Sequence, residues 1–116
     1  MMVTVIAALA GMIAVGLGAF GAHALSSGFD EKASGWWETA TLYLLVHAAL
    51  ATALSALDAP KFGLAAAVVL GGAAVFAATL YAMALGAPRW FGAITPMGGL
   101  GMLAGWALIA WAALTS

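Results

Sequence analysis

The chain has 116 residues, of which 66% are hydrophobic and 6% are charged, and it contains no cysteine. An ordinary soluble domain carries about 25% charged residues, so a soluble bundle of this composition would expose apolar surface on every face and aggregate. The lack of cysteine excludes thiol catalysis, disulfides and thiolate-bound metals. A net charge of −1 with three scattered cations excludes a nucleic-acid surface.

The seven charged residues fall in three short clusters and leave four stretches without Asp, Glu, Lys or Arg: 1–29, 39–57, 62–88 and 90–116. A helix rising about 1.5 Å per residue needs about 20 apolar residues to cross a hydrocarbon layer about 30 Å thick. In lipid each segment must satisfy its own backbone hydrogen bonds, which makes these stretches helices. The sequence therefore predicts an all-α integral membrane protein, a single domain built as an antiparallel four-helix bundle.

In chain order, the sequence predicts helices over about 3–25, 36–57, 62–85 and 91–114. We expect the first to be a retained span and not a signal peptide, because no Lys or Arg precedes it and its apolar run is long. Pro60 is suited to the first position of the third helix. Thr95-Pro96 predicts a perturbation about one turn into the fourth helix.

Small residues recur at helical spacing along three of the predicted helices, as close packing in lipid requires. Alanine is abundant throughout, so the glycines are the informative members of these stripes. We expect helix backbones to come closest at Gly18, Gly21, Gly101 and Gly105. The full set of glycines expected in helix packing is Gly11, Gly18, Gly21, Gly71, Gly101 and Gly105. Packing within one bundle is the preferred interpretation, although the G-x-x-x-G pair formed by Gly101 and Gly105 also serves association between copies.

Polar residues inside a membrane are costly, so each is a candidate binding residue. Most lie in the half of the membrane near the 26–35 loop. The candidates are His23, Glu38, Tyr43, His47, Tyr81 and Thr95. By helical rise, His23, Glu38, Tyr81 and Thr95 reach one layer. They form either a shared pocket or four separately solvated interfacial residues.

His47 lies about 16 Å into the second predicted helix, near the midplane, with Tyr43 one turn away. It is either a neutral imidazole bonded to a neighbouring helix, or a proton relay or cofactor ligand. Glu38 either stabilises the start of its helix through the dipole or binds protons as a buried carboxylate. The two histidines differ in depth and no carboxylate pair joins them at ligand spacing, so we predict no metal and no other cofactor.

Four segments together resemble a known family: 18–25, the second-helix residues Thr39-Ala40, Tyr43 and His47-Ala48, then Leu80-Tyr81, and 92–99 with Gly105-Trp106. They are similar, in order and over nearly the whole chain, to the motifs of the family called domain of unknown function 423 (transmembrane protein 256-like). One departure is 76–79, where the family more often has a run containing serine and glycine. The resemblance implies a small four-helix protein of the inner membrane and supplies no activity.

Three functions follow from these observations. The preferred one is a non-enzymatic membrane protein that self-associates or acts as an accessory subunit of a larger membrane complex. The second is a small homodimeric transporter or channel with a polar site near the 26–35 loop. An enzyme that uses His47 and Tyr43 ranks last. The expected partners are the lipid bilayer and either a second copy or a larger complex.

Overall fold

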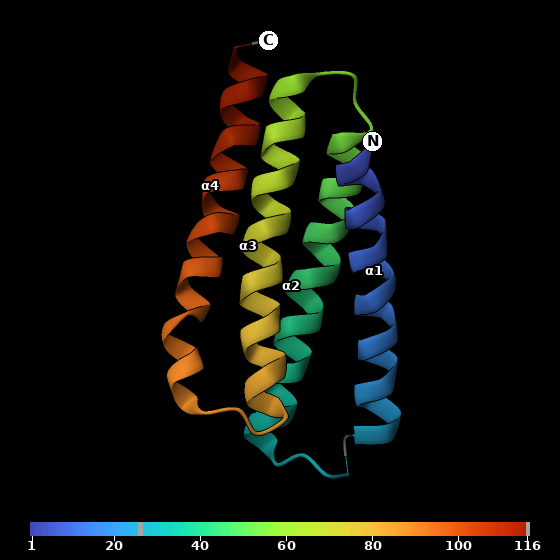
Figure 1. Ribbon diagram of the computed structural model, residues 1–116, viewed down its shortest axis with the longest axis vertical. Helices are drawn as coiled ribbons and strands as arrows, with labels where there is room; N and C mark the ends of the chain where they lie inside the picture. The colour runs from blue at the N-terminus through green and yellow to red at the C-terminus, as the bar shows by residue number, and fades with distance from the viewer. Residues whose placement is uncertain (26, 116) are drawn as a thin grey trace.

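The computed structural model describes residues 1–25 and 27–115, and these residues form the predicted all-α fold. Four long helices run antiparallel in chain order (Figure 1): α1 (Met2–Phe20), α2 (Glu31–Ser55), α3 (Pro60–Ala84) and α4 (Thr95–Leu114). The π-helical turn η1 (Gly21–Leu25) extends α1, and the 3-10 turn η2 (Arg89–Ala93) precedes α4. The main contacts join α1 to α2, α2 to α3, and α3 to α4.

Three helical segments in the described ranges have the length and hydropathy to span a membrane: Met2–His23, Pro60–Ala84 and Arg89–Leu114. α2 is 25 residues long, but polar residues such as Glu38 and His47 lower its hydropathy. Because α1 and α3 run in the same direction (Figure 1), α2 has to carry the chain back across the same layer. The helix that falls short on composition is therefore also a span.

The start of α2 differs from the sequence prediction. The helix begins at Glu31 and not near residue 36. Its N-cap is Asp30, whose carboxylate accepts a hydrogen bond of 2.7 Å from the Ala33 N–H. An anionic residue in the first turn is favoured by the helix dipole. The acidic residues thus begin the helix, and the loop that precedes it is shorter than the expected 26–35.

The start of α4 also corrects the prediction. Pro96 lies in the first turn of α4, where its missing N–H has no intrahelical partner to lose. The expected perturbation inside a helix is instead the beginning of that helix, after the separate turn η2. The Thr95 hydroxyl donates to the Phe91 carbonyl at 3.3 Å across this junction. Pro60 occupies the first position of α3, as predicted.

Buried apolar side chains form two clusters along the length of the molecule. One lies toward the loop between α1 and α2 and includes Trp37, Leu80 and Tyr81. The other lies toward the two termini and includes Leu54 and Val69. The first cluster holds the larger aromatic rings, and the candidate site is built around it.

Glycines let α3 and α4 pack backbone against backbone. A Cβ placed on Gly72 would lie 2.5 Å from the Met102 nitrogen, and one on Gly101 would lie 3.0 Å from the Gly72 Cα. A Cβ on Gly105 would overlap Val69, and one on Gly98 would overlap the α3 backbone. Close approach at small residues is the usual means of helix association in lipid, and here it joins the last two helices.

Glycines on α1 meet side chains of α2. A Cβ on Gly18 would lie 2.9 Å from the Thr41 Cγ2, and one on Gly21 would overlap the Trp37 indole. Gly11 is less constrained, since a Cβ there would make an ordinary contact of 3.7 Å with the Ala48 Cβ. α1 is therefore held closest to α2 at its loop end.

Gly71 does not lie at a helix contact within the chain, where packing inside one bundle was the preferred interpretation. A Cβ on Gly71 would meet nothing within 4 Å, whereas the adjacent Gly72 faces α4. The helix repeats every 3.6 residues, so neighbouring residues differ in direction by about 100°. Spacing in the sequence identified a stripe without fixing its direction. Ala67, Ala74 and Ala78, which are in register with Gly71, are also exposed, and Ala82 at the end of this stripe is half-buried.

The two adjacent glycines of α3 provide a matched test of this packing. Gly72→Ala should lower the free energy of unfolding by about 1–3 kcal/mol because the new methyl group overpacks the contact with α4. Gly71→Ala should leave it unchanged or raise it slightly, since the methyl group enters open space. Thermal unfolding in mild detergent, at protein concentrations that keep the chain monomeric, measures both. Equal melting temperatures for the two variants would contradict the assignment.

Candidate functional site

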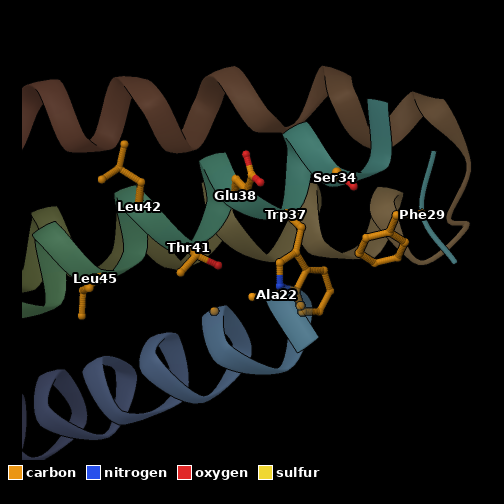
Figure 2. Close-up of a pocket in the computed structure, with 10 residues that line it drawn as sticks. Ala22, Phe29, Ser34, Trp37, Glu38, Thr41, Leu42 and Leu45 are labelled. Carbon is orange, nitrogen blue, oxygen red and sulfur yellow. The ribbon is translucent and has the colours of Figure 1, made fainter. Parts of the chain in front are cut away.

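A cavity of about 540 Å³ lies between α1 and α2, at the end of the molecule near the loop that joins them (Figure 2). Trp37, Thr41 and Leu45 point from α2 toward α1, whereas Glu38 and Leu42 point away from α1 in this view. Both residues still belong to the lining, at the outer edge of the pocket. The complete lining is Gly18, Gly21, Ala22, Phe29, Ser34, Trp37, Glu38, Thr41, Leu42 and Leu45.

Trp37 forms the inner wall of this pocket and joins three parts of the chain. Its side chain is 5% exposed, and its indole N–H donates a hydrogen bond of 2.7 Å to the Leu17 carbonyl of α1. The ring packs against Gly21, where α1 changes to the π-helical turn η1. Its centroid lies 4.5 Å from that of Tyr81 and 5.5 Å from that of Phe29. Any residue larger than glycine at position 21 would displace the indole.

A second polar contact fixes the wall behind Trp37. The Thr41 hydroxyl and the Tyr81 hydroxyl share a hydrogen bond of 2.7 Å between α2 and α3. Tyr81 is buried, and the Thr41 methyl group faces Gly18 of α1. Together with Trp37, this contact connects α1, α2 and α3 at one level, so the inner side of the pocket is joined to all three helices.

Glu38 is the charged group of the pocket. Its side chain is exposed at the rim, and none of the other nine lining residues carries a charge. Within residues 1–25 and 27–115, the Glu38 carboxylate has no hydrogen-bond or ion-pair partner. The pocket therefore combines one unpaired anion with the Ser34 and Thr41 hydroxyls and an apolar remainder.

His47 lies elsewhere, in a contact between α2 and α4. It is 5% exposed; its Nε2 lies 3.1 Å from the Trp106 Nε1, and its Nδ1 lies 2.7 Å from the Tyr43 carbonyl oxygen. An indole N–H can only donate and a carbonyl oxygen can only accept. The Nε2 is therefore the acceptor, and the proton sits on Nδ1. Both nitrogens are used, so the geometry favours a neutral structural imidazole over a cofactor ligand or proton relay.

Tyr43 and His47 line a second groove of about 540 Å³ between α2 and α4. Phe76 of α3 lies at its base, with the Tyr43 and Phe76 ring centroids 4.8 Å apart. The α4 side is formed by residues such as Leu100 and Leu103, which are exposed. His47 is the most polar side chain in this groove, and both of its nitrogens already have partners.

The structure separates the six candidate residues. Glu38 lines the α1–α2 pocket, whereas Tyr43 and His47 line the α2–α4 groove. Tyr81 and Thr95 point inward but to different partners, since Thr95 shares a hydrogen bond of 2.6 Å with Thr79. The side chain of His23 is exposed on η1.

His23, Tyr81 and Thr95 thus do not converge on one pocket. The depth of these residues could be predicted from helical rise, but the rotation of each helix about its axis could not. No group of three or more His, Cys, Asp or Glu side chains in the described part of the chain could hold a metal ion.

Two residues at the centre of the pocket, Trp37 and Thr41, were not among the candidates. The signal that could have found them is complementary spacing: Trp37 and Thr41 are four residues apart on α2, and Gly18 and Gly21 are three apart on α1. Large and small residues one turn apart on neighbouring helices predict interdigitation.

The assigned state of His47 can be tested by ¹⁵N NMR, because the chain has two histidines and His23→Asn leaves one. We expect a neutral ring with the proton on Nδ1. Trp106→Phe should move the Nε2 resonance, since it removes the donor. Trp111→Phe is the matched control and should leave that resonance in place. A charged ring, or a response to Trp111→Phe alone, would contradict the assignment.

The chain is similar to a family of membrane proteins. The family model described as protein of unknown function (DUF423) matches residues 17–99. The UPF0382 membrane protein of Haemophilus influenzae is 42% identical over 112 residues, covering 94% of this chain and 90% of the relative. No solved structure matches the chain.

Two further relatives extend the match to other bacteria. The UPF0382 inner membrane protein YgdD of Escherichia coli is 37% identical over 109 residues, covering 90% of this chain and 83% of the relative. The UPF0382 membrane protein SH2409 of Staphylococcus haemolyticus is 35% identical over 108 residues, covering 90% and 88%. With its apolar helices, the chain is a small multi-pass protein of the inner membrane. It belongs to the DUF423 family, whose members are described as proteins of unknown function.

Proposed function

We propose that this protein is a non-enzymatic membrane protein that acts by associating with a second copy of itself through α3. The observation that carries the proposal is the exposed small-residue face of α3, formed by Ala67, Gly71, Ala74 and Ala78. A Cβ on Gly71 would meet nothing within 4 Å inside the chain. A glycine that has no packing role within one copy is free to pack against another helix.

The length of this face suits a helix pair. From residue 67 to residue 78 it extends about 16 Å along the axis, which is roughly half the hydrocarbon thickness. Leu64 and Val75, which are 57% and 42% exposed, flank it with larger side chains. Small residues in the centre with branched residues beside them allow backbones to approach closely, and van der Waals packing then drives association in lipid.

The interior supports a non-enzymatic role. Within the described residues, no buried side-chain nitrogen or oxygen lacks a hydrogen-bond partner. The pairs His47–Trp106, Thr41–Tyr81 and Thr79–Thr95 involve atoms that a catalytic site would need free. These pairs hold helices together and leave no buried nucleophile or base beside an empty pocket.

The same face would also serve an accessory subunit, with the helix of a foreign protein in place of the second copy. A homodimeric transporter or channel is the second candidate, and Glu38 is the observation that favours it. This carboxylate opens into a pocket at one end of the molecule, where it could bind a cation. The apolar residues Leu42 and Leu45 follow it toward the centre, and they weaken this candidate because they interrupt a polar path.

Association can be measured by fluorescence energy transfer between labelled copies in lipid vesicles at increasing dilution. We expect the wild-type chain to form dimers, and Gly71→Leu to raise the dissociation constant about tenfold or more because it blocks close approach. Gly16→Leu is the matched control. Gly16 is an exposed glycine on α1 at which a Cβ would also meet nothing within 4 Å.

A monomeric wild-type chain, or equal effects of Gly71→Leu and Gly16→Leu, would contradict self-association through α3. A stoichiometric foreign subunit that co-purifies from native membranes and is lost with Gly71→Leu would instead support the accessory role. Cation uptake into vesicles that is lost with Glu38→Gln would support the transporter.

A further inference from the structure

We propose that the α1–α2 pocket binds the headgroup of a membrane lipid that carries a primary ammonium group, with Glu38 as its ion-pair partner. The proposal concerns a different surface from the α3 face and does not depend on self-association. It rests on an unpaired carboxylate, a neighbouring hydroxyl and apolar lining residues that lie together at one end of the molecule.

The pocket lies at the depth of lipid headgroups. Gly21 and Ala22 line it from η1, and they belong to the end of the apolar span Met2–His23. On α2 the carboxylate of Glu38 directly follows Trp36 and Trp37, and tryptophans are enriched where hydrocarbon meets headgroups. A ligand in this pocket therefore has its polar part at the membrane interface.

Four of the five charged side chains at this end of the molecule line one of two cavities, and Glu31 lines neither. Glu38 is the charged member of the α1–α2 pocket. Lys32 and Arg89 line a neighbouring cavity that also holds Asp30, and the Lys32 ammonium lies 5.9 Å from the centre of the Trp36 ring. No cation of the described chain thus neutralises Glu38. The electrostatic attraction between a lipid cation and Glu38 would be strong there, because the apolar surroundings weaken screening.

The arrangement of the lining matches an amphiphile. Ser34 lies one helical turn before Glu38, and Leu42 and Leu45 lie one and two turns after it, toward the membrane centre. The polar and apolar parts are about 10 Å apart along α2. When a headgroup lies beside Ser34 and Glu38, its acyl chain therefore lies along Leu42 and Leu45. The volume of about 540 Å³ is that of a small-molecule site.

A primary ammonium suits the pocket better than a quaternary one. An ammonium with N–H groups can donate to the Glu38 carboxylate and to the Ser34 hydroxyl oxygen. A quaternary ammonium has no donors and is recognised by open aromatic faces. Trp37 is 5% exposed, with Phe29 and Tyr81 packed against its ring, so it offers no open face.

The test uses native mass spectrometry of the full chain, reconstituted with equimolar phosphatidylethanolamine, phosphatidylcholine and phosphatidylglycerol that carry identical acyl chains. We expect the wild-type chain to retain phosphatidylethanolamine about tenfold more than phosphatidylcholine, which corresponds to about 1.4 kcal/mol. Glu38→Gln should abolish this preference, and Ser34→Ala should reduce it.

Glu31→Gln is the matched control, because Glu31 is an exposed carboxylate on the same helix outside the pocket. It should keep the preference. Gly71→Leu should also keep it, since the lipid site is independent of self-association. Thermal unfolding of Glu38→Gln should match the wild-type chain, because the side chain is exposed and without a partner.

Several results would overturn the proposal. Equal retention of the ethanolamine and choline lipids by the wild-type chain would exclude recognition of the ammonium protons. An unchanged preference in Glu38→Gln, or its loss in Glu31→Gln as well, would exclude Glu38 as the specific partner. Preferential retention of phosphatidylglycerol would move the site to the cavity of Lys32 and Arg89.

Discussion

In hydrocarbon there is no water to satisfy a polar side chain, and this constraint decides how the four helices are joined. Each pair of consecutive helices, and also the pair α2 and α4, is connected by at least one polar contact. Trp37 bonds to the α1 backbone, Tyr81 to Thr41, Thr95 to Thr79, and Trp106 to His47. A rotation of any helix that broke its contact would expose a polar atom to lipid. The hydrogen bonds therefore set the rotation of the helices, although each one contributes only a modest free energy.

Close packing at glycine makes those contacts possible, against α2 side chains at Gly18 and Gly21 and against backbone between α3 and α4. The indole of Trp37 reaches the Leu17 carbonyl because Gly21 leaves room for the ring, and Thr41 reaches Tyr81 beside Gly18. On the other side of the molecule, Gly72 and Gly98 bring α3 and α4 together, and Thr79 and Thr95 meet one to two turns away. Small residues and polar residues thus act as pairs: the first shortens the distance between helices, and the second fixes their orientation.

The number, direction and approximate bounds of the helices could be predicted from the sequence, because charge depletion and the thickness of a membrane are sufficient for that inference. The rotation of each helix could not. Gly71 and Gly72 are equivalent in spacing arguments and face opposite surroundings, and Tyr81 and Thr95 share a depth but not a partner. The first residues of α2 and α4, Glu31 and Thr95, were also not predicted. The capping carboxylate of Asp30 was assigned to a loop, and the first-turn proline Pro96 was interpreted as a kink inside a helix. Glu38, predicted as a binding candidate, lines the pocket. Its neighbours Trp37 and Thr41 were identified only from the structure.

Two features of the chain take no part in the contacts that join its helices, and the functional proposals are based on these two features. Natural sequences are consistent across levels of structure, so a feature without an internal purpose indicates an external one. Glu38 is a carboxylate at the edge of an apolar frame without a counter-ion from the described chain, and a Cβ on Gly71, in the small-residue face of α3, would meet nothing within 4 Å. The two proposals assign a lipid cation to the first feature and the backbone of a second copy to the second. A lipid headgroup supplies a cation but no helix backbone, so the two proposals concern different partners and can be tested separately.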